Sequence, residues 1–225
     1  MPATIDAAQV AFPDAEIIVA DGGSTDGTPD WVRQNKDIQL VISATGGRGP
    51  QMNAGAVAAD PAADILLFLH ADCFLPPDAR QRITDAIAEP RQAGGCFPVR
   101  FAEALPASLT VTAALINSQS RVRRAATGDQ AIWVRRPVWD SLGGYRPWPL
   151  FEDIEFVDRL KRRCGRNAFV VLSGAAVTIS ARRWREFGVA GTSFWMCLLW
   201  LGYKIGISPV RLKRWFSDIR PHLKR

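Results

Sequence analysis

The chain has 225 residues, 48% of them hydrophobic and 22% charged, which is enough to bury one sizeable core. Its formal net charge of +6 favours anionic partners such as nucleotides, phosphates or an acidic membrane surface. No basic run is interleaved with aromatic residues on a recognisable binding module, so we do not expect nucleic acid as a partner.

The predicted elements alternate between strands and helices along most of the chain. Apolar runs predict strands at 17–20, 40–42, 65–69, 94–101, 131–134, 168–172 and 176–180. Helical periodicity and end signals predict helices at 4–12, from 28 through 32, and at 77–88, 106–122, 137–142 and 151–163. This alternation favours a single α/β domain with a mostly parallel, doubly wound sheet.

The first glycine-rich turn, Asp-Gly-Gly-Ser-Thr-Asp-Gly-Thr at 21–28, follows the strand at 17–20. Its backbone can approach a ligand closely, and the Asp21 carboxylate can accept hydrogen bonds from a ribose or a base. An ordinary turn between a strand and a helix would explain the same residues. Thr28 is predicted to cap the next helix, with Pro29 as its first residue.

A second glycine-rich loop, at 45–49, follows the strand at 40–42. Arg48 offers a guanidinium fork suited to a diphosphate, and a helix of small residues follows it.

His70 and Asp72 directly follow the predicted strand at 65–69. Because ligands of open α/β sheets bind beyond the carboxyl ends of the strands, both side chains would reach that crevice. They could face a metal ion or a phosphate there. The alternative is that Asp72 caps the following helix and His70 packs on it.

The helix at 151–163 begins with three carboxylates in its first turn, those of Glu152, Asp153 and Glu155. Complementing the helix dipole is the structural explanation for them. The functional explanation is that Asp153 or Glu152 acts as a general base at the crevice.

In this order, the segments resemble a family 2 glycosyltransferase of the GT-A fold. The matching stretches are 17–28, 48–56, 66–72, 94–95, 128–129, 143–145 and 152–153. The resemblance implies a GT-A, Rossmann-like domain over residues 1–184, which binds a nucleotide sugar and carries out catalysis. A helical tail would occupy residues 185–225.

The resemblance also implies a role for particular residues. Contacts to the nucleotide-sugar donor would come from Asp21, Gly22, Ser24, Arg48, Ala71, Asp72 and Arg183. Asp72 and His70 would hold Mn²⁺ or Mg²⁺, with His70 in the place of the first Asp of the family's Asp-x-Asp motif. Asp153 would be the catalytic base with Glu152 beside it, and Gly128, Asp129 and Trp184 would contact the acceptor. Ser180 stands where some members have Gln in a Gln-x-x-Arg-Trp signature.

The expected function is therefore an inverting glycosyl transfer from a UDP-sugar to an acceptor hydroxyl, including a lipid-linked one. A nucleoside diphosphate leaves more readily once a divalent cation and an arginine neutralise its charge. One alternative is a nucleotidyltransferase on a related fold. The other is a catalytically impaired, sugar-nucleotide-binding protein at a membrane surface.

One element of the family's fold has no counterpart at the start of this sequence. Family members begin with an apolar strand that lies centrally in the sheet, and nothing strand-like precedes Thr4. We therefore expect an N-terminally incomplete domain in which the strands at 17–20 and 65–69 pair directly or in part. The alternatives are that another segment or chain fills the gap between them, or that the chain is poorly stable.

Residues 187–203 carry no charge and precede a basic segment with Arg211, Lys213, Arg214 and Arg220. They fall short of the ~20 apolar residues that span a bilayer. They predict a helix lying on an anionic membrane face. A helix packed on the sheet is the alternative.

The histidines and cysteines limit the other kinds of site. Only His70 and His222 are present, which excludes a site of three histidines. The four cysteines form no Cys-x-x-Cys pair, which is typical of reduced thiols. With no secretory signal ahead of the domain, we expect a cytoplasmic location, peripheral on the cytoplasmic face of the inner or plasma membrane.

Overall fold

The computed structural model describes residues 1–35, 37–42, 47–102, 107–182, 184 and 188–219. The strands are β1 (Ile17–Asp21), β2 (Ile38–Ile42), β3 (Ile65–Phe68), β4 (Cys73–Phe74), β5 (Gly94–Cys96), β6 (Val99–Phe101), β7 (Ile132–Arg135), β8 (Phe169–Val171) and β9 (Val177–Ile179). The helices are α1 (Pro2–Ala11), α2 (Thr28–Gln34), α3 (Arg48–Ala58), α4 (Ala79–Ile87), α5 (Ala107–Arg123), α6 (Arg136–Leu142), α7 (Glu152–Cys164), α9 (Val189–Lys204) and α10 (Pro209–Ile219), with short 3₁₀ turns η1 (Gly128–Gln130) and η2 (Arg166–Ala168).

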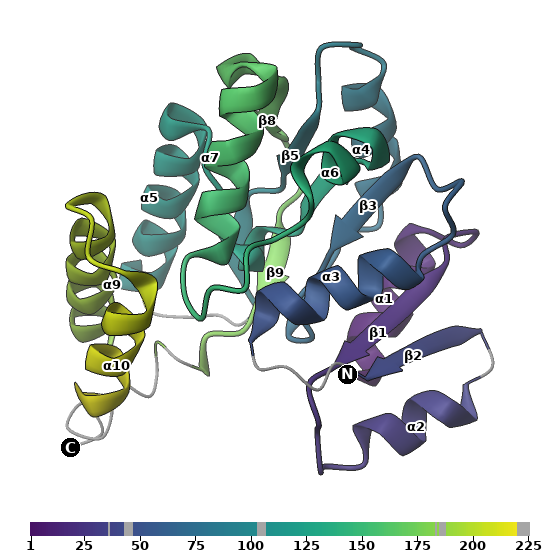
Figure 1. Ribbon diagram of the computed structural model, residues 1–225, viewed down its shortest axis with the longest axis horizontal. Coiled ribbons are helices and arrows are strands. Elements are labelled where there is room, and N and C mark those ends of the chain that lie inside the picture. The colour runs from purple at the N-terminus through teal and green to yellow at the C-terminus, as the bar shows by residue number, and fades with distance from the viewer. Residues whose placement is uncertain (36, 43–46, 103–106, 183, 185–187, 220–225) are drawn as a thin grey trace.

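The central sheet has the strand order β3-β7-β5-β8. β7 runs antiparallel to both β3 and β5, and β8 runs parallel to β5, so β3, β5 and β8 all point the same way. The predicted α/β class with a mostly parallel sheet is confirmed. A three-stranded sheet, β4-β9-β6, and the parallel pair β1-β2 lie beside it (Figure 1).

The core lies on both faces of the central sheet, as the alternation along β7 shows. Ile132 and Val134 pack into one cluster with Phe156 and Leu160 of α7. Trp133 points to the opposite face and packs into a second cluster with residues of α4. Successive side chains of a strand alternate between faces, so a fully apolar strand indicates a sheet covered on both sides.

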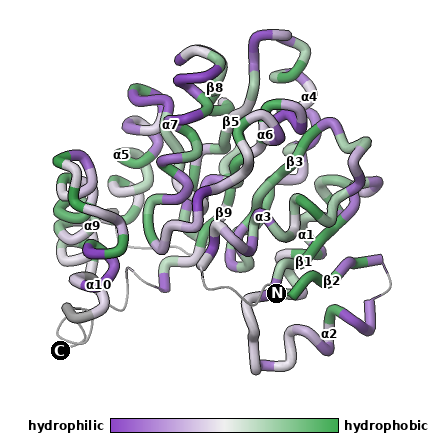
Figure 2. The backbone as a smooth tube through the Cα atoms, in the orientation of Figure 1, coloured by the Kyte–Doolittle hydropathy of each residue, from purple (hydrophilic) through white to green (hydrophobic). Residues whose placement is uncertain are grey.

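The predicted pairing between β1 and β3 is wrong. Among the described strands, β1 pairs with β2 and β3 pairs with β7, in separate sheets. Figure 2 shows both as hydrophobic segments. Helix α1 contributes to the core of both parts: Ile5 shares a cluster with Val19 of β1, and Ala11 belongs to the cluster against which Leu67 of β3 packs. Apolar packing therefore connects them in place of a shared ladder.

Two predicted boundaries are also wrong. Gly27 precedes α2 with φ +81, a left-handed conformation that glycine adopts readily, and Thr28 is already helical instead of capping. The predicted strand at 94–101 divides into β5 and β6, which belong to different sheets. Pro98 lies between them and has no N–H to continue a ladder.

The tail forms two helices that pack on each other and on the chain just before α7. Leu199 of α9 and Leu212 of α10 form a buried cluster with Phe151. α9 also lies beside α5. There the Arg123 guanidinium lies over the Trp200 ring, with its central carbon Cζ 4.3 Å from the ring centroid. No helix in the described ranges is long and apolar enough to cross a membrane.

Candidate functional site

Three segments converge at one place: the end of β3, the turn η1 and the first turn of α7. His70 Nδ1 lies 2.9 Å from Asp129 Oδ1. The neighbouring Gly128 N–H donates to Asp153 Oδ2 over 2.7 Å. Residues 70, 128–129 and 153, which are far apart in sequence, are thereby joined by direct contacts.

The turn η1 is connected to its neighbours by hydrogen bonds and close packing. The Gln130 side chain accepts a hydrogen bond from the Thr127 N–H at 3.1 Å and donates one to the Phe97 carbonyl at 3.2 Å. A Cβ at residue 128 would collide with the His70 ring, so only glycine allows this approach. His70 Nε2 is buried and has no hydrogen-bond partner among the described residues.

Burial raises the pKa of both carboxyls at the start of α7. For Glu152, the negative charge of Asp153 raises the pKa further, and Arg48 lowers it in part. For Asp153, burial is the largest effect, and hydrogen bonds from the Gly128 and Ile154 N–H groups oppose it. A carboxyl whose pKa is raised by burial is a better proton acceptor than an exposed one, which suits a general base.

His70, Asp72 and Cys73 form a possible metal-binding group, with donor atoms within 4.8 Å of one another. Burial raises the pKa of the Cys73 thiol, and a soft sulfur donor is not the usual ligand of Mn²⁺ or Mg²⁺. The exposed Asp72 carboxylate and an imidazole nitrogen remain, and this O and N set fits Mn²⁺ or Mg²⁺. The sequence prediction did not include Cys73, although its position next to Asp72 was a usable signal.

Asp21 lies at the carboxyl end of β1, where its Oδ2 accepts the N–H groups of Gly23 and Ser24 at 2.8 Å each. Hydrogen bonding by Ser24 holds the pKa of Asp21 below its ordinary value. Gly22 lies close to the Gln51 side chain of α3, where a Cβ would collide with it. A pocket of about 320 Å³ opens here, lined by Asp21, Gly23, Ser24, Thr25, Gly27, Pro29, Asp30, Arg33 and Ile42.

Arg48 is the first residue of α3 and its side chain is exposed. Its charge lowers the pKa of both Glu152 and Cys73, which places it near the carboxylates and near the metal-binding group. Ala71, beside that group, accepts a hydrogen bond from the Thr4 hydroxyl at 2.7 Å through its carbonyl oxygen. The lining of the Asp21 pocket includes neither Arg48 nor Asp72.

Other predicted residues do not join these contacts. Arg183 and Gly46 lie outside the described residues, as do Arg220 and His222. Trp184 packs against the ring of Phe101 on β6, with centroids 5.8 Å apart. The pair of His70 and Asp129 was not foreseen, because only the fold brings the two together.

Three solved structures illustrate the fold that this chain shares with known proteins. The mannosyltransferase PcManGT from Pyrobaculum calidifontis, with GDP-Man and Mn²⁺, has a TM-score of 0.60 and 18% identity over 79% of this chain and 52% of its own. Glucosyl-3-phosphoglycerate synthase from Mycobacterium tuberculosis, with Mn²⁺, UDP-glucose and glycerol 3-phosphate, has a TM-score of 0.54 and 20% identity. The match covers 77% of this chain and 68% of the synthase. S. aureus TarS 1–349 has a TM-score of 0.62 and 15% identity. The match covers 92% of this chain and 61% of the TarS chain.

At these low identities, the TM-scores show a shared fold alone. The chain spans about half the length of the mannosyltransferase. No curated protein matches the chain. The family model described as glycosyl transferase family 2 matches residues 1–143, which is more than half of the sequence. The chain therefore belongs to glycosyl transferase family 2.

Proposed function

We propose that this chain transfers a sugar from a nucleoside-diphosphate sugar to an acceptor hydroxyl, with inversion at the anomeric carbon. The observation that carries the proposal is the link from His70 through Gly128 and Asp129 to Asp153. It brings a potential metal ligand and a buried carboxylate to one place. Two of the structural neighbours hold a nucleotide sugar together with Mn²⁺, which supports this choice of donor.

The donor would lie between the Asp21 pocket and the metal-binding group. Asp21, Gly22 and Ser24 would contact the nucleoside, for which we propose uridine. Arg48 would contact the diphosphate, together with Asp72 and the backbone of Ala71. The exposed guanidinium of Arg48 supports this role, because a planar fork binds two phosphate oxygens at once. Arg183 would add a second cation.

Asp72 and His70 would hold the divalent cation, with phosphate oxygens completing its ligands. When bound, the ion neutralises charge on the departing diphosphate. Asp72 is the carboxylate of the described group of His70, Asp72 and Cys73, so it should matter more for binding than the imidazole does.

Asp153 would act as the base. As the acceptor oxygen attacks the anomeric carbon, its proton passes to the Asp153 carboxylate. The bond from that carbon to the diphosphate oxygen breaks, and the diphosphate leaves with the electron pair. One displacement at one carbon inverts its configuration. Gly128, Asp129 and Trp184 would contact the acceptor, Glu152 would support Asp153, and a lipid-linked hydroxyl is the acceptor that we favour.

Binding without transfer is a second candidate, which the separation of β1 from β3 favours. The pocket at Asp21 and the carboxylate at Asp153 belong to parts joined by packing and not by a ladder. Small displacements between a bound donor and the base would reduce turnover strongly. A nucleotidyltransferase lacks comparable support.

The experiment is donor turnover with and without Mn²⁺. Release of nucleoside diphosphate from UDP-glucose, UDP-N-acetylglucosamine and GDP-mannose would be measured with a panel of hydroxyl acceptors, beside donor binding by calorimetry. We expect Mn²⁺-dependent release by the native chain, and loss of Mn²⁺-dependent binding in Asp72→Asn. Binding without release supports the second candidate. If the native chain shows no donor binding and no release of nucleoside diphosphate, both candidate functions are overturned.

A further inference from the structure

Helix α9 exposes an apolar face to solvent. Phe194, Leu198 and Leu201 of α9, and Ile205 directly after its last residue, are 62%, 45%, 52% and 70% exposed. Their spacing of four, three and four residues places them on one face of the helix. The opposite face packs inward through Leu199. Single exposed apolar side chains are common on protein surfaces, whereas several that gather on one face indicate an interaction surface.

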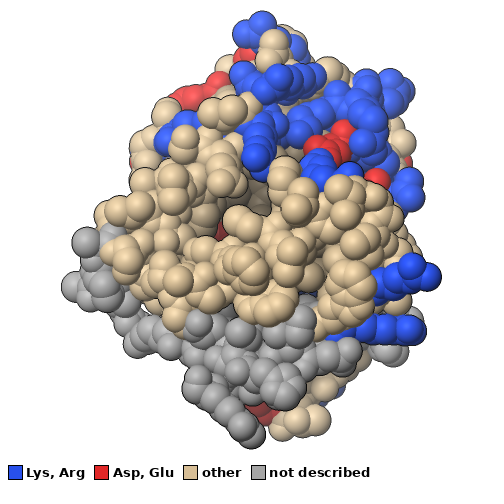
Figure 3. Space-filling model, turned by 90° about the vertical axis from the view of Figure 1, so that its left-hand side faces the viewer, with Lys and Arg blue, Asp and Glu red and all other residues tan. Residues whose placement is uncertain are grey.

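Helix α5, beside α9, continues this surface. It exposes Val111, Leu115 and Val122 by 57%, 57% and 68%. Neither α5 nor α9 contains an acidic residue. On this side of the molecule, Figure 3 shows a broad, mostly uncharged area with a small acidic spot in a central hollow. Lys and Arg, with a few acidic side chains among them, border it above, and further Lys and Arg lie to the right.

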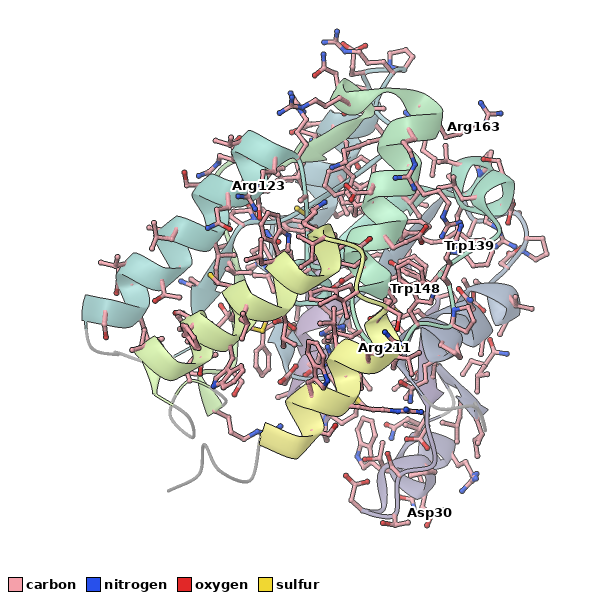
Figure 4. All side chains as sticks on the ribbon, turned by 60° about the vertical axis from the view of Figure 1, so that its left-hand side comes forward. Asp30, Arg123, Trp139, Trp148, Arg163 and Arg211 are labelled. Atoms are coloured by element: carbon pink, nitrogen blue, oxygen red, sulfur yellow. The ribbon has the colours of Figure 1, made fainter. Side chains whose placement is uncertain are left out.

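Basic side chains lie around the apolar face. Those exposed on α5, α9 and α10 are Arg121, Arg123, Lys204, Arg211, Lys213 and Arg214. Figure 4 shows Arg123 near the end of α5 and Arg211 on α10, with α9 between these helices. Trp215, on α10, is 51% exposed. An exposed tryptophan among cations is typical of a helix at the boundary between headgroups and acyl chains.

The charges decide which occupant fits this surface. In a symmetric dimer the same patch would face itself, so the basic borders of two copies would repel each other. Anionic lipid headgroups complement the same borders, while the acyl chains take up the apolar side chains between them.

We propose that the surface formed by α5, α9 and α10 docks this protein on an anionic lipid membrane. α9 lies in the plane of the interface, with Phe194 and Leu201 inserted below the headgroups and the cations of α10 among them. This docking does not depend on catalytic activity.

The test is flotation of the full chain with vesicles of phosphatidylglycerol and phosphatidylcholine, against phosphatidylcholine alone. The apolar variant is Phe194→Gln with Leu201→Gln. Its matched control is Val10→Gln with Val57→Gln, since Val10 and Val57 are 66% and 73% exposed on α1 and α3. The charge variant is Arg211→Glu with Arg214→Glu. Its control is Arg91→Glu with Arg163→Glu, at exposed positions outside the tail.

We expect the native chain and both controls to float with the anionic vesicles. The apolar variant should bind about tenfold or more weakly, because two large side chains no longer leave water. The charge variant should lose about fivefold per residue on anionic vesicles. A native chain that stays unbound at low salt overturns the proposal. So does a dimer in sedimentation that the apolar variant, but not its control, dissociates.

Discussion

The ring of Phe151 lies 5.0 Å from the ring of Tyr203, with an angle of 30° between the two planes. Phe151 has φ +63, a left-handed conformation that non-glycine residues seldom adopt. It directly precedes Glu152 and Asp153. Because such a conformation persists only when its surroundings hold it, the tail helices help to fix where the first turn of α7 begins.

Tyr203→Ala should therefore lower kcat by about tenfold or more, with a smaller change in the KM for the donor. The donor pocket at Asp21 lies on other elements, whereas the ring of Tyr203 supports the residue before the base. Steady-state kinetics measure the two constants separately. Tyr203→Phe is the matched control, and it should keep native rates because the ring remains. Equal losses of activity in both variants would contradict this role.

Asp153→Asn tests the base directly. It should lower kcat by about 10²–10⁴-fold, the usual range for a general base. Donor affinity should change little, since the amide oxygen can still accept the Gly128 N–H. The measurements are single-turnover rates and thermal melting. A variant with native turnover and a lowered Tm would assign Asp153 to helix structure and leave Glu152 as the candidate.

The raised pKa of Asp153 predicts opposite effects of pH on stability and on activity. A carboxyl whose pKa is raised on folding contributes stability below its unfolded pKa, and that contribution is lost as the pH rises through the folded pKa. Turnover needs the deprotonated base, so it should rise over the same interval. Urea unfolding and kcat would be followed together across this interval.

The comparison for this experiment is Asp153→Asn, in which that part of the pH dependence of stability should disappear. Asp21 should behave in the opposite way, because its pKa is lowered on folding. Its contribution is present above the unfolded pKa and is lost as the pH falls through the folded one. If Asp153→Asn left the pH dependence of stability unchanged, Asp153 would not be its source.

Most of the fold was predictable because its strands are continuous apolar runs with clear ends. The run at 65–69 contains β3, and the helix predicted at 151–163 is α7, which begins one residue later, at Glu152. The division at Pro98 was missed, although a proline inside a predicted strand is itself a signal against a continuous one. The predicted pairing of β1 with β3 was wrong, because β1 pairs with β2 and β3 pairs with β7.

The candidate site was less predictable than the fold. The residue types at 70, 72 and 153 were identifiable from local pattern and resemblance. Their connection was not, because it depends on contacts between residues 59 and 25 positions apart in the sequence, such as those made by Asp129 and Gly128. The left-handed conformation of Phe151 has no sequence signal, since it comes from packing against α9 and α10.

Gly128→Ala tests whether the contact between η1 and His70 holds the site together. The added methyl group would collide with the imidazole, so the turn or the ring must move. Gly128 does not have a positive φ, so alanine is compatible with its backbone. Overpacking of this kind costs about 1–3 kcal/mol. We expect a loss of stability together with weaker Mn²⁺-dependent donor binding and lower kcat.

A double-mutant cycle with His70→Ala separates this contact from a general disturbance of η1. With the imidazole removed, the methyl group has space, so Gly128→Ala should cost much less stability in the His70→Ala background than alone. The coupling free energy should then be of the size seen for residues in contact, about 0.5–3 kcal/mol. Denaturant unfolding of the four proteins measures it. Additive losses would mean that His70 and Gly128 act independently, and that the turn reaches Asp153 without help from the imidazole.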